Sequence, residues 1–136
     1  MKQLNSAYGD KIKIIFRHMP LESIHPNARP ASIASICAQK QEKFWPMHDK
    51  LFANQQDLNE GNYKAWGKEL GLDAAAFEAC LKDESGEVSK IVDKDLNLAQ
   101  KIGVNSTPTF FVNGKKVAGA LGFDQFKALI DQELAN

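Results

Sequence analysis

Cys37 and Cys80 are the two side chains of this chain that could perform thiol chemistry. They could be buried free thiols, the usual state of unpaired cysteine, or a structural disulfide, which an oxidising compartment preserves. A catalytic pair is a third hypothesis, which the sequence disfavours because redox-active dithiols normally form a Cys-x-x-Cys motif that is absent here. Free thiols and a structural disulfide both stay open, because sequence does not fix the geometry of the pair.

The three histidines, His18, His25 and His48, could in principle bind a metal. Their positions lack the paired Cys-x2-Cys or His-x3-His spacing of a zinc site. We therefore expect hydrogen-bonded structural histidines, with no metal and no cofactor. Phe44, Trp45 and Trp66 have the spacing of helix–helix core residues, and a peptide-binding groove is the alternative.

Thr107-Pro108 stands directly before a run of β-branched and aromatic residues, Thr109–Val112. Proline in a sheet is confined to strand starts, edges and bulges, and an X-Pro bond is trans by default. Asn113-Gly114 is the signal of a two-residue type I′ turn, so the segment predicts a β-hairpin that returns over Lys116–Gly119.

Most of the remaining chain has helical periodicity. A short helix before Gly9, a strand over Lys11–Arg17 with Ile12, Ile14 and Phe16 on one face, and a last helix over 124–134 flank five central helices. Candidate N-caps of the central helices are Asn27, Asp73 and Ser85. The side chains expected to face inward in the central helices are Phe44, Met47, His48, Leu51, Phe52, Tyr63, Trp66, Leu70, Phe77, Cys80, Leu81, Val88, Ile91, Val92, Ala99 and Ile102.

Composition limits the class of protein. The 136 residues are 43% hydrophobic and 25% charged, which is ordinary for a globular chain, and we expect one domain over 1–136. The 17 basic and 17 acidic residues cancel, so nothing electrostatic favours nucleic acid as a partner. No apolar run approaches the roughly 20 residues that cross a bilayer, so no membrane insertion is expected.

The segment Val104–Val117 closely resembles the part of the thioredoxin superfamily in which the proline is cis. Phe16–Leu21, followed by His25–Ala28, resembles the stretch after the second strand of DsbA-like oxidoreductases. Three further segments resemble the helical insertion of that family: Cys37–Trp45, Met47–Phe52 and Phe77–Leu81. The resemblance covers nearly the whole chain. It implies an α/β thioredoxin-like fold with a large helical insertion over about 27–103.

The chain departs from this family because the Cys-x-x-Cys and the strand before it are absent. We therefore expect that the N-terminal core strand and the start of the first helix are missing from a truncated sequence. In the thioredoxin fold that strand lies between those matching Lys11–Arg17 and Thr109–Val112. The gap could be filled by a strand exchanged with another copy, by a separate fragment, or by direct re-pairing of the two neighbours.

The resemblance implies the body of a thiol:disulfide oxidoreductase that exchanges disulfides with cysteine-containing polypeptides in the periplasm or cell envelope. Thr107 and Pro108 would then hold the substrate strand, while this chain alone would be redox-inactive. Two alternatives remain: a redox-inactive peptide-binding module, and a glutathione-dependent isomerase or transferase with the same inserted helices. A strand-exchanged homo-oligomer is a further possible consequence.

Overall fold

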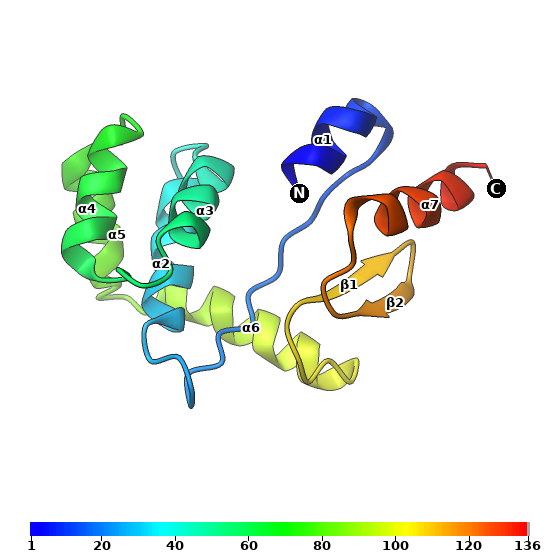
Figure 1. The fold of residues 1–136 in the computed structure, drawn as a ribbon. Coiled ribbons are helices and arrows are strands. Elements are labelled where there is room, and N and C mark those ends of the chain that lie inside the picture. The colour runs from blue at the N-terminus through cyan, green and yellow to red at the C-terminus, as the bar shows by residue number, and fades with distance from the viewer. Residues whose placement is uncertain (136) are drawn as a thin grey trace. The chain divides into compact units, whose positions relative to one another are not determined.

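The computed structural model describes residues 1–135, which form two compact units (Figure 1). Unit 1 contains Met1–Arg17 and the chain from Ala99 onward, and unit 2 contains His18–Leu98, inserted between these two segments. Each unit has its own cluster of buried apolar side chains. The single domain with an insertion over about 27–103 stays a prediction.

Unit 1 is built on a β-hairpin. Its elements are α1 (Lys2–Tyr8), the 3-10 turn η1 (Gly9–Lys11), β1 (Thr109–Val112), β2 (Lys115–Ala118) and α7 (Phe123–Leu134). β1 and β2 pair antiparallel, with Phe110 opposite Val117. Asn113 and Gly114 have φ values of 46° and 84°, which a type I′ turn requires at both positions. The predicted hairpin is confirmed, although β2 begins one residue earlier than expected.

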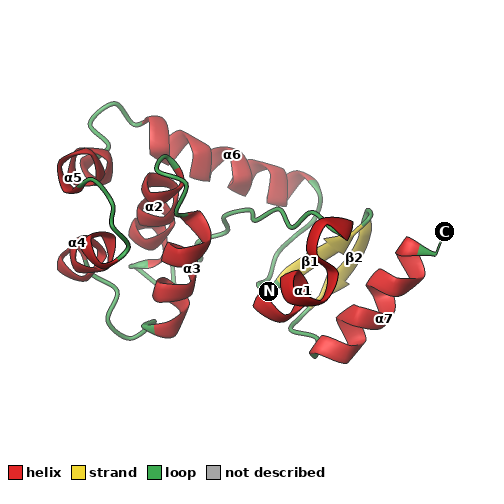
Figure 2. Ribbon diagram, turned by 90° about the horizontal axis from the view of Figure 1, so that it is seen from above, coloured by secondary structure: helices red, strands yellow, loops and turns green. Residues whose placement is uncertain are grey.

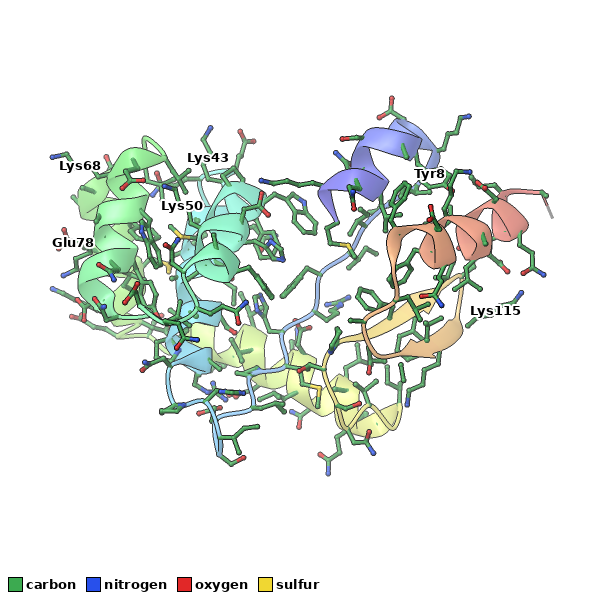
Figure 3. The ribbon with its side chains drawn as sticks, viewed as in Figure 1. Tyr8, Lys43, Lys50, Lys68, Glu78 and Lys115 are labelled. Carbon is green, nitrogen blue, oxygen red and sulfur yellow. A yellow bond between two sulfur atoms is a disulfide. The ribbon has the colours of Figure 1, made fainter. Side chains whose placement is uncertain are left out.

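Helices α1 and α7 enclose the core of unit 1 with β1 (Figure 2). The rings of Phe110 on β1 and Phe126 on α7 meet edge to face, with their centroids 4.6 Å apart. Tyr8 is buried at the end of α1 and donates its hydroxyl to the Asp131 carboxylate on α7 at 2.6 Å (Figure 3). The short α1 is therefore stabilised by burial of one face and by this hydrogen bond, because seven residues are marginal as an isolated helix.

The prediction of a strand over Lys11–Arg17 is wrong, because this segment pairs with no strand among residues 1–135. Lys11 belongs to η1, and the described residues form one two-stranded sheet in which β1 pairs with β2. Direct re-pairing of this segment with β1 therefore does not occur among residues 1–135. The alternation of apolar and polar residues correctly predicted the apolar face at Ile12 and Ile14, which pack against the unit 1 core. A period of two fixes which face is apolar, but a ladder also needs a neighbour at hydrogen-bonding distance.

Unit 2 is helical. It contains α2 (Ala28–Gln39), α3 (Phe44–Ala53), α4 (Glu60–Glu69), α5 (Ala74–Lys82) and most of α6 (Glu87–Lys101), whose last residues belong to unit 1. The five predicted central helices are confirmed. Phe77, Met47 and Val92 are at most 1% exposed at the centre of this core.

Some side chains predicted to face inward are exposed instead: Phe52 is 57% exposed, Ile91 42%, Trp45 37% and Ile102 46%. On α3, Met47 and Leu51 form the buried stripe, since residues four apart share a helix face. Phe52 lies on the adjacent stripe and stacks against His48, with ring centroids 4.5 Å apart. The apolar arc of the helix is therefore wider than the surface that its neighbours bury.

The predicted caps have different outcomes. Asp73 caps α5 as expected, accepting the Ala76 amide at 2.7 Å. Asn27 precedes α2, but its side chain makes no capping hydrogen bond. The predicted cap of α6 at Ser85 is weak, because its hydroxyl lies 3.4 Å from the Glu87 amide nitrogen.

Asp83 supplies the strong contacts at the start of α6. Its carboxylate oxygens accept the amides of Val88 at 2.9 Å and Ser89 at 2.8 Å. The residue itself adopts φ 45° at the end of α5, a left-handed conformation that Asp and Asn tolerate better than most residues. One residue thus ends α5 and caps α6.

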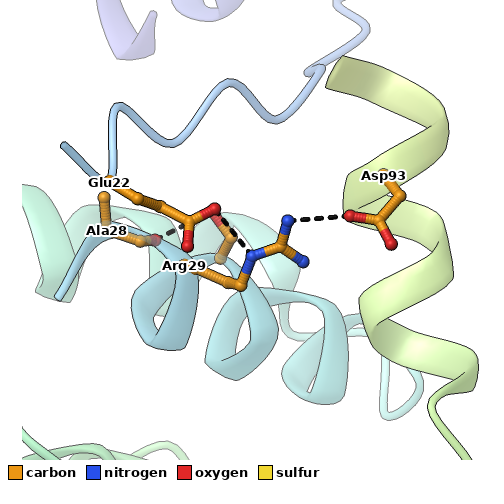
Figure 4. A network of polar contacts seen from close by, with 5 residues as sticks. Glu22, Ala28, Arg29 and Asp93 are labelled. Atoms are coloured by element: carbon orange, nitrogen blue, oxygen red, sulfur yellow. Dashed lines mark hydrogen bonds and ion pairs between the residues drawn. The ribbon is translucent and has the colours of Figure 1, made fainter. Parts of the chain in front are cut away.

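A pair of salt bridges at Arg29 joins α2 to α6 and to the loop before α2. Arg29 on α2 donates to Glu22 of the preceding loop and to Asp93 on α6, each at 2.7 Å (Figure 4). Arg29 is only 25% exposed while the two carboxylates are about half exposed, so the less exposed guanidinium bridges two groups at the surface. The contact fixes the loop before α2.

Replacing Asp83 by Asn should lower the free energy of unfolding by about 1 kcal/mol, because hydrogen bonds to an ionised acceptor stabilise more than those to a neutral acceptor. Asn tolerates the left-handed conformation and keeps one acceptor, so the change removes mainly the charge. Ser85→Ala is the matched control and should change stability by a few tenths of a kcal/mol at most. Chemical denaturation followed by circular dichroism measures both variants. Equal losses in the two variants would contradict the assignment of the cap.

The stability lost in Asp83→Asn should depend on pH. Burial raises the pKa of Asp83, but hydrogen bonds from Ser89 and Val88 outweigh it and leave this pKa below 3.8. A depressed pKa gives stability that is present above the unfolded-state value and is lost as the pH falls through the folded-state value. The advantage of the natural carboxylate should therefore be complete at neutral pH, begin to fall below about pH 4 and disappear once the pH is below the folded-state pKa.

Candidate functional site

The first candidate site is the segment that leads into β1. The Thr107–Pro108 peptide bond is cis, and both residues are exposed. The Pro108 carbonyl accepts the Gly119 amide at 2.9 Å, and the Thr109 hydroxyl donates to the Ser106 carbonyl at 2.7 Å. The main chain on both sides of Pro108 is thus held by hydrogen bonds while Thr107 faces solvent.

The pairing with β2 determines which main-chain groups stay available. In an antiparallel pair, hydrogen-bonded residues alternate along each strand. Pro108 bonds to Gly119, and Phe110 and Val112 lie opposite Val117 and Lys115. Residues 108, 110 and 112 therefore point their main-chain groups toward β2. Those of the intervening residues point to the other edge, where the described residues place no strand. An extended polypeptide can add to such an edge.

The second candidate site is the cysteine pair. Cys37 on α2 and Cys80 on α5 form a disulfide with an S–S distance of 2.05 Å and a Cα–Cα distance of 5.7 Å. Cys37 is 1% exposed within the unit 2 core. The structure thus brings the two cysteines together as a disulfide, in a unit other than that of Thr107 and Pro108. While the bond is intact, neither sulfur is available as a thiolate nucleophile.

His18 and His48 have structural contacts, whereas His25 is exposed. His18 is 6% exposed, and its main-chain amide donates to the buried Asp95 carboxylate at 2.8 Å. Burial lowers the pKa of His18; nearby Asp95 opposes this shift and His48 adds to it. His48 Nδ1 lies 3.2 Å from the Asp49 carboxylate. No group of three or more His, Cys, Asp or Glu side chains within residues 1–135 could hold a metal ion.

Asp95 is a buried polar residue that the sequence did not single out. It lies on α6 seven residues after Val88 and three after Val92, both of which are buried. That spacing places all three on one face of the helix, so the position could have been found. A carboxylate on an apolar helix face implies a buried donor, which here is the amide of His18.

The fold and this site define a class of protein. The class is a thioredoxin-like α/β domain: a β-hairpin entered through an exposed proline, followed by a C-terminal helix and interrupted earlier by a helical unit. The chain matches the thioredoxin family over residues 1–132, and it belongs to that family. The predicted fold class is confirmed.

Several curated proteins are similar to this chain. The Na(+)/H(+) antiporter NhaA 1 of Mycobacterium sp. (strain KMS) is 37% identical over 117 residues, which is 86% of this chain and 19% of that protein. NhaA 1 of Salinispora arenicola is 35% identical over 124 residues, covering 91% of this chain and 19% of its own length. The chain therefore spans about a fifth of the length of these relatives. No solved structure matches it.

Among the described residues, none of the helices combines the length and apolarity needed to cross a bilayer.

Replacing both cysteines by alanine should lower the free energy of unfolding by roughly 3–4 kcal/mol in the chain-entropy model. The disulfide closes a loop of 43 positions, which restricts the unfolded chain. Denaturant titration with and without reductant measures the effect. The natural chain should lose stability on reduction, and the double variant should not respond. A natural chain insensitive to reductant, with two free thiols by titration, would contradict the disulfide.

Proposed function

We propose that this chain is the body of a DsbA-like thiol:disulfide oxidoreductase acting on cysteine-containing polypeptides. The observation that carries the proposal is the exposed Thr107–Pro108 segment at an open edge of β1, in a chain of the thioredoxin family. The inserted helical unit and the segments that resemble DsbA-like proteins support the same subfamily.

In this proposal Thr107 binds the substrate through its main chain. Its N–H and C=O groups pair with an extended polypeptide next to the cysteine that reacts, so recognition depends little on substrate side chains. Thiol–disulfide exchange then needs a thiolate that attacks a disulfide sulfur and forms a mixed disulfide. Cys37 and Cys80 do not serve as that thiolate, because they are bonded to each other and Cys37 is buried. The reactive sulfur belongs to a Cys-x-x-Cys outside these 136 residues.

A redox-inactive peptide-binding module is the second candidate. It is favoured by one observation: both cysteines of the described chain are in the disulfide that joins α2 to α5. Such a module would bind peptides at the same edge, next to Thr107, without catalysing thiol–disulfide exchange. The two candidates differ in whether a Cys-x-x-Cys accompanies this chain in the cell.

A periplasmic or cell-envelope location is part of the proposal. The Cys37–Cys80 disulfide supports it, because disulfides form and persist in oxidising compartments and are rare in the reducing cytosol.

The 136-residue chain should not catalyse insulin reduction by dithiothreitol, because it has no accessible thiolate. Turbidity of the precipitating insulin chain follows the reaction, and a complete thioredoxin-family enzyme is the positive control. Catalysis that disappears in Cys37→Ser would show that the disulfide is itself redox-active and would contradict the assignment.

The chain should bind an extended peptide that carries serine in place of the reactive cysteine, with the largest amide chemical-shift change at Thr107. N-methylation of the peptide groups that pair with Thr107 should weaken binding about tenfold or more, because each lost hydrogen bond costs about 1 kcal/mol. Thr107→Ala is the matched control and should bind normally, since its main chain is retained. A strong loss in Thr107→Ala would show side-chain recognition instead.

A further inference from the structure

We infer that the polypeptides that dock at Thr107 carry acidic residues on either side of the docking position. The inference rests on the proposed function, because it names the class of polypeptide that the same site takes. Main-chain pairing at Thr107 distinguishes one polypeptide from another only weakly, so a preference comes from the charged groups around it.

The two units of the chain carry opposite charge. Unit 1 has eight Lys and Arg residues but only four Asp and Glu residues, whereas unit 2 has nine basic and thirteen acidic residues. The neutral total of the whole chain hides this difference. Thr107 belongs to the basic unit. A surface with an excess of one sign raises the local concentration of partners of the opposite sign, so unit 1 favours acidic polypeptides.

Ion pairs on α7 engage half of the acidic residues of unit 1. Lys127 pairs with Asp131 at 2.6 Å, and Lys115 pairs with Glu133 at 2.5 Å. Both carboxylates lie on α7, so they neutralise lysines on the α7 side of the unit. Two acidic residues remain in unit 1, and six other basic residues outnumber them.

The part of unit 1 that contains Thr107 has positive charge only. Residues 96–123, which include the whole hairpin, contain three lysines and no Asp or Glu. Lys116 donates to the Gly103 carbonyl at 2.6 Å. Gly103 is four residues before Thr107, so the two Cα atoms are at most about 14 Å apart. Because a carbonyl is neutral, this contact leaves the charge of Lys116 uncompensated near the docking position.

Two of the lysines project from the same face of unit 1. Lys116 is opposite Phe111 in the hairpin, and opposite residues share a face. The neighbours of Phe111 on β1 pack against the unit 1 core, so this face points away from the core. Lys13 is exposed and lies between two isoleucines that pack against the same core. An extended polypeptide at Thr107 directs alternate side chains toward this face, where acidic ones meet lysines.

A polypeptide fits this charge better than an anionic membrane does. The excess of lysine accompanies a main-chain edge at which the described residues place no further strand. Lipid headgroups supply negative charge but have no main chain to pair with that edge. An acidic polypeptide satisfies the charge and the edge together.

Two peptides test the inference on the 136-residue chain. Both carry serine in place of the reactive cysteine, and the two residues on each side of it are glutamate in one peptide and lysine in the other. At about 20 mM salt the glutamate peptide should bind at least about tenfold tighter, because the screening length is then about 20 Å. At about 0.5 M salt the two affinities should differ by about twofold or less. Calorimetry measures the affinities, and the amide chemical shift of Thr107 locates the binding.

Neutralising exposed lysines should change the two affinities in opposite directions. In low salt, Lys13→Gln combined with Lys101→Gln should weaken binding of the glutamate peptide about threefold and strengthen that of the lysine peptide about threefold. Damage to the fold would weaken both. Lys90→Gln combined with Lys94→Gln is the matched control, since it removes the same charge from exposed residues of unit 2 and should leave the ratio of affinities unchanged.

Three results would overturn the inference. Equal affinities, with a shift at Thr107 for both peptides, would leave the proposed docking intact and remove only the preference for acidic polypeptides. Tighter binding of the glutamate peptide without a shift at Thr107, together with binding to phosphatidylglycerol vesicles, would assign the lysines to an anionic membrane. If neither peptide binds, docking at Thr107 fails, and the inference fails with it.

Discussion

Main-chain hydrogen bonding of β1 is the constraint on which unit 1 depends. A strand carries two rows of donors and acceptors, and β2 pairs with only one of them. The hairpin turn at Asn113-Gly114 sets the register, and the register decides which residues face the open edge. This pairing thus leaves the main-chain groups of Thr109 and Phe111 at the edge of β1 that faces away from β2.

Unit 2 is stabilised differently, because helices form the hydrogen bonds of their own main chain except at their ends. Its stability comes from a buried apolar core, from side-chain contacts at helix starts such as Asp73 and Asp83, and from the Cys37–Cys80 disulfide. The disulfide lies where α2 and α5 pack against each other within this unit. Both of its sulfurs are bonded to each other within unit 2, so the thiol–disulfide exchange proposed for this chain needs other cysteines.

Local patterns predicted most of the elements. The hairpin, the five central helices and the cap at Asp73 depend on residues close in sequence, so they could be predicted. The patterns failed where the outcome depends on the exact backbone conformation or on packing against a neighbouring helix. Asp83 displaced Ser85 as the cap of α6 because the left-handed end of α5 aims its carboxylate at the next helix. Phe52 is exposed because no neighbouring helix among the described residues covers its side of α3.

The sequence alone determined the fold family, the hairpin with its proline, and the absence of a Cys-x-x-Cys from these 136 residues. These properties follow from the order of residues along the chain, so no interatomic distance is needed to recognise them. Tertiary structure alone decided that Cys37 and Cys80 are bonded, that Lys11–Arg17 does not join the sheet of the described chain, and that Asp95 holds the amide of His18. Each of these depends on the distance in space between groups that are far apart in sequence. Packing sets that distance, and the periodicity of the sequence does not encode it.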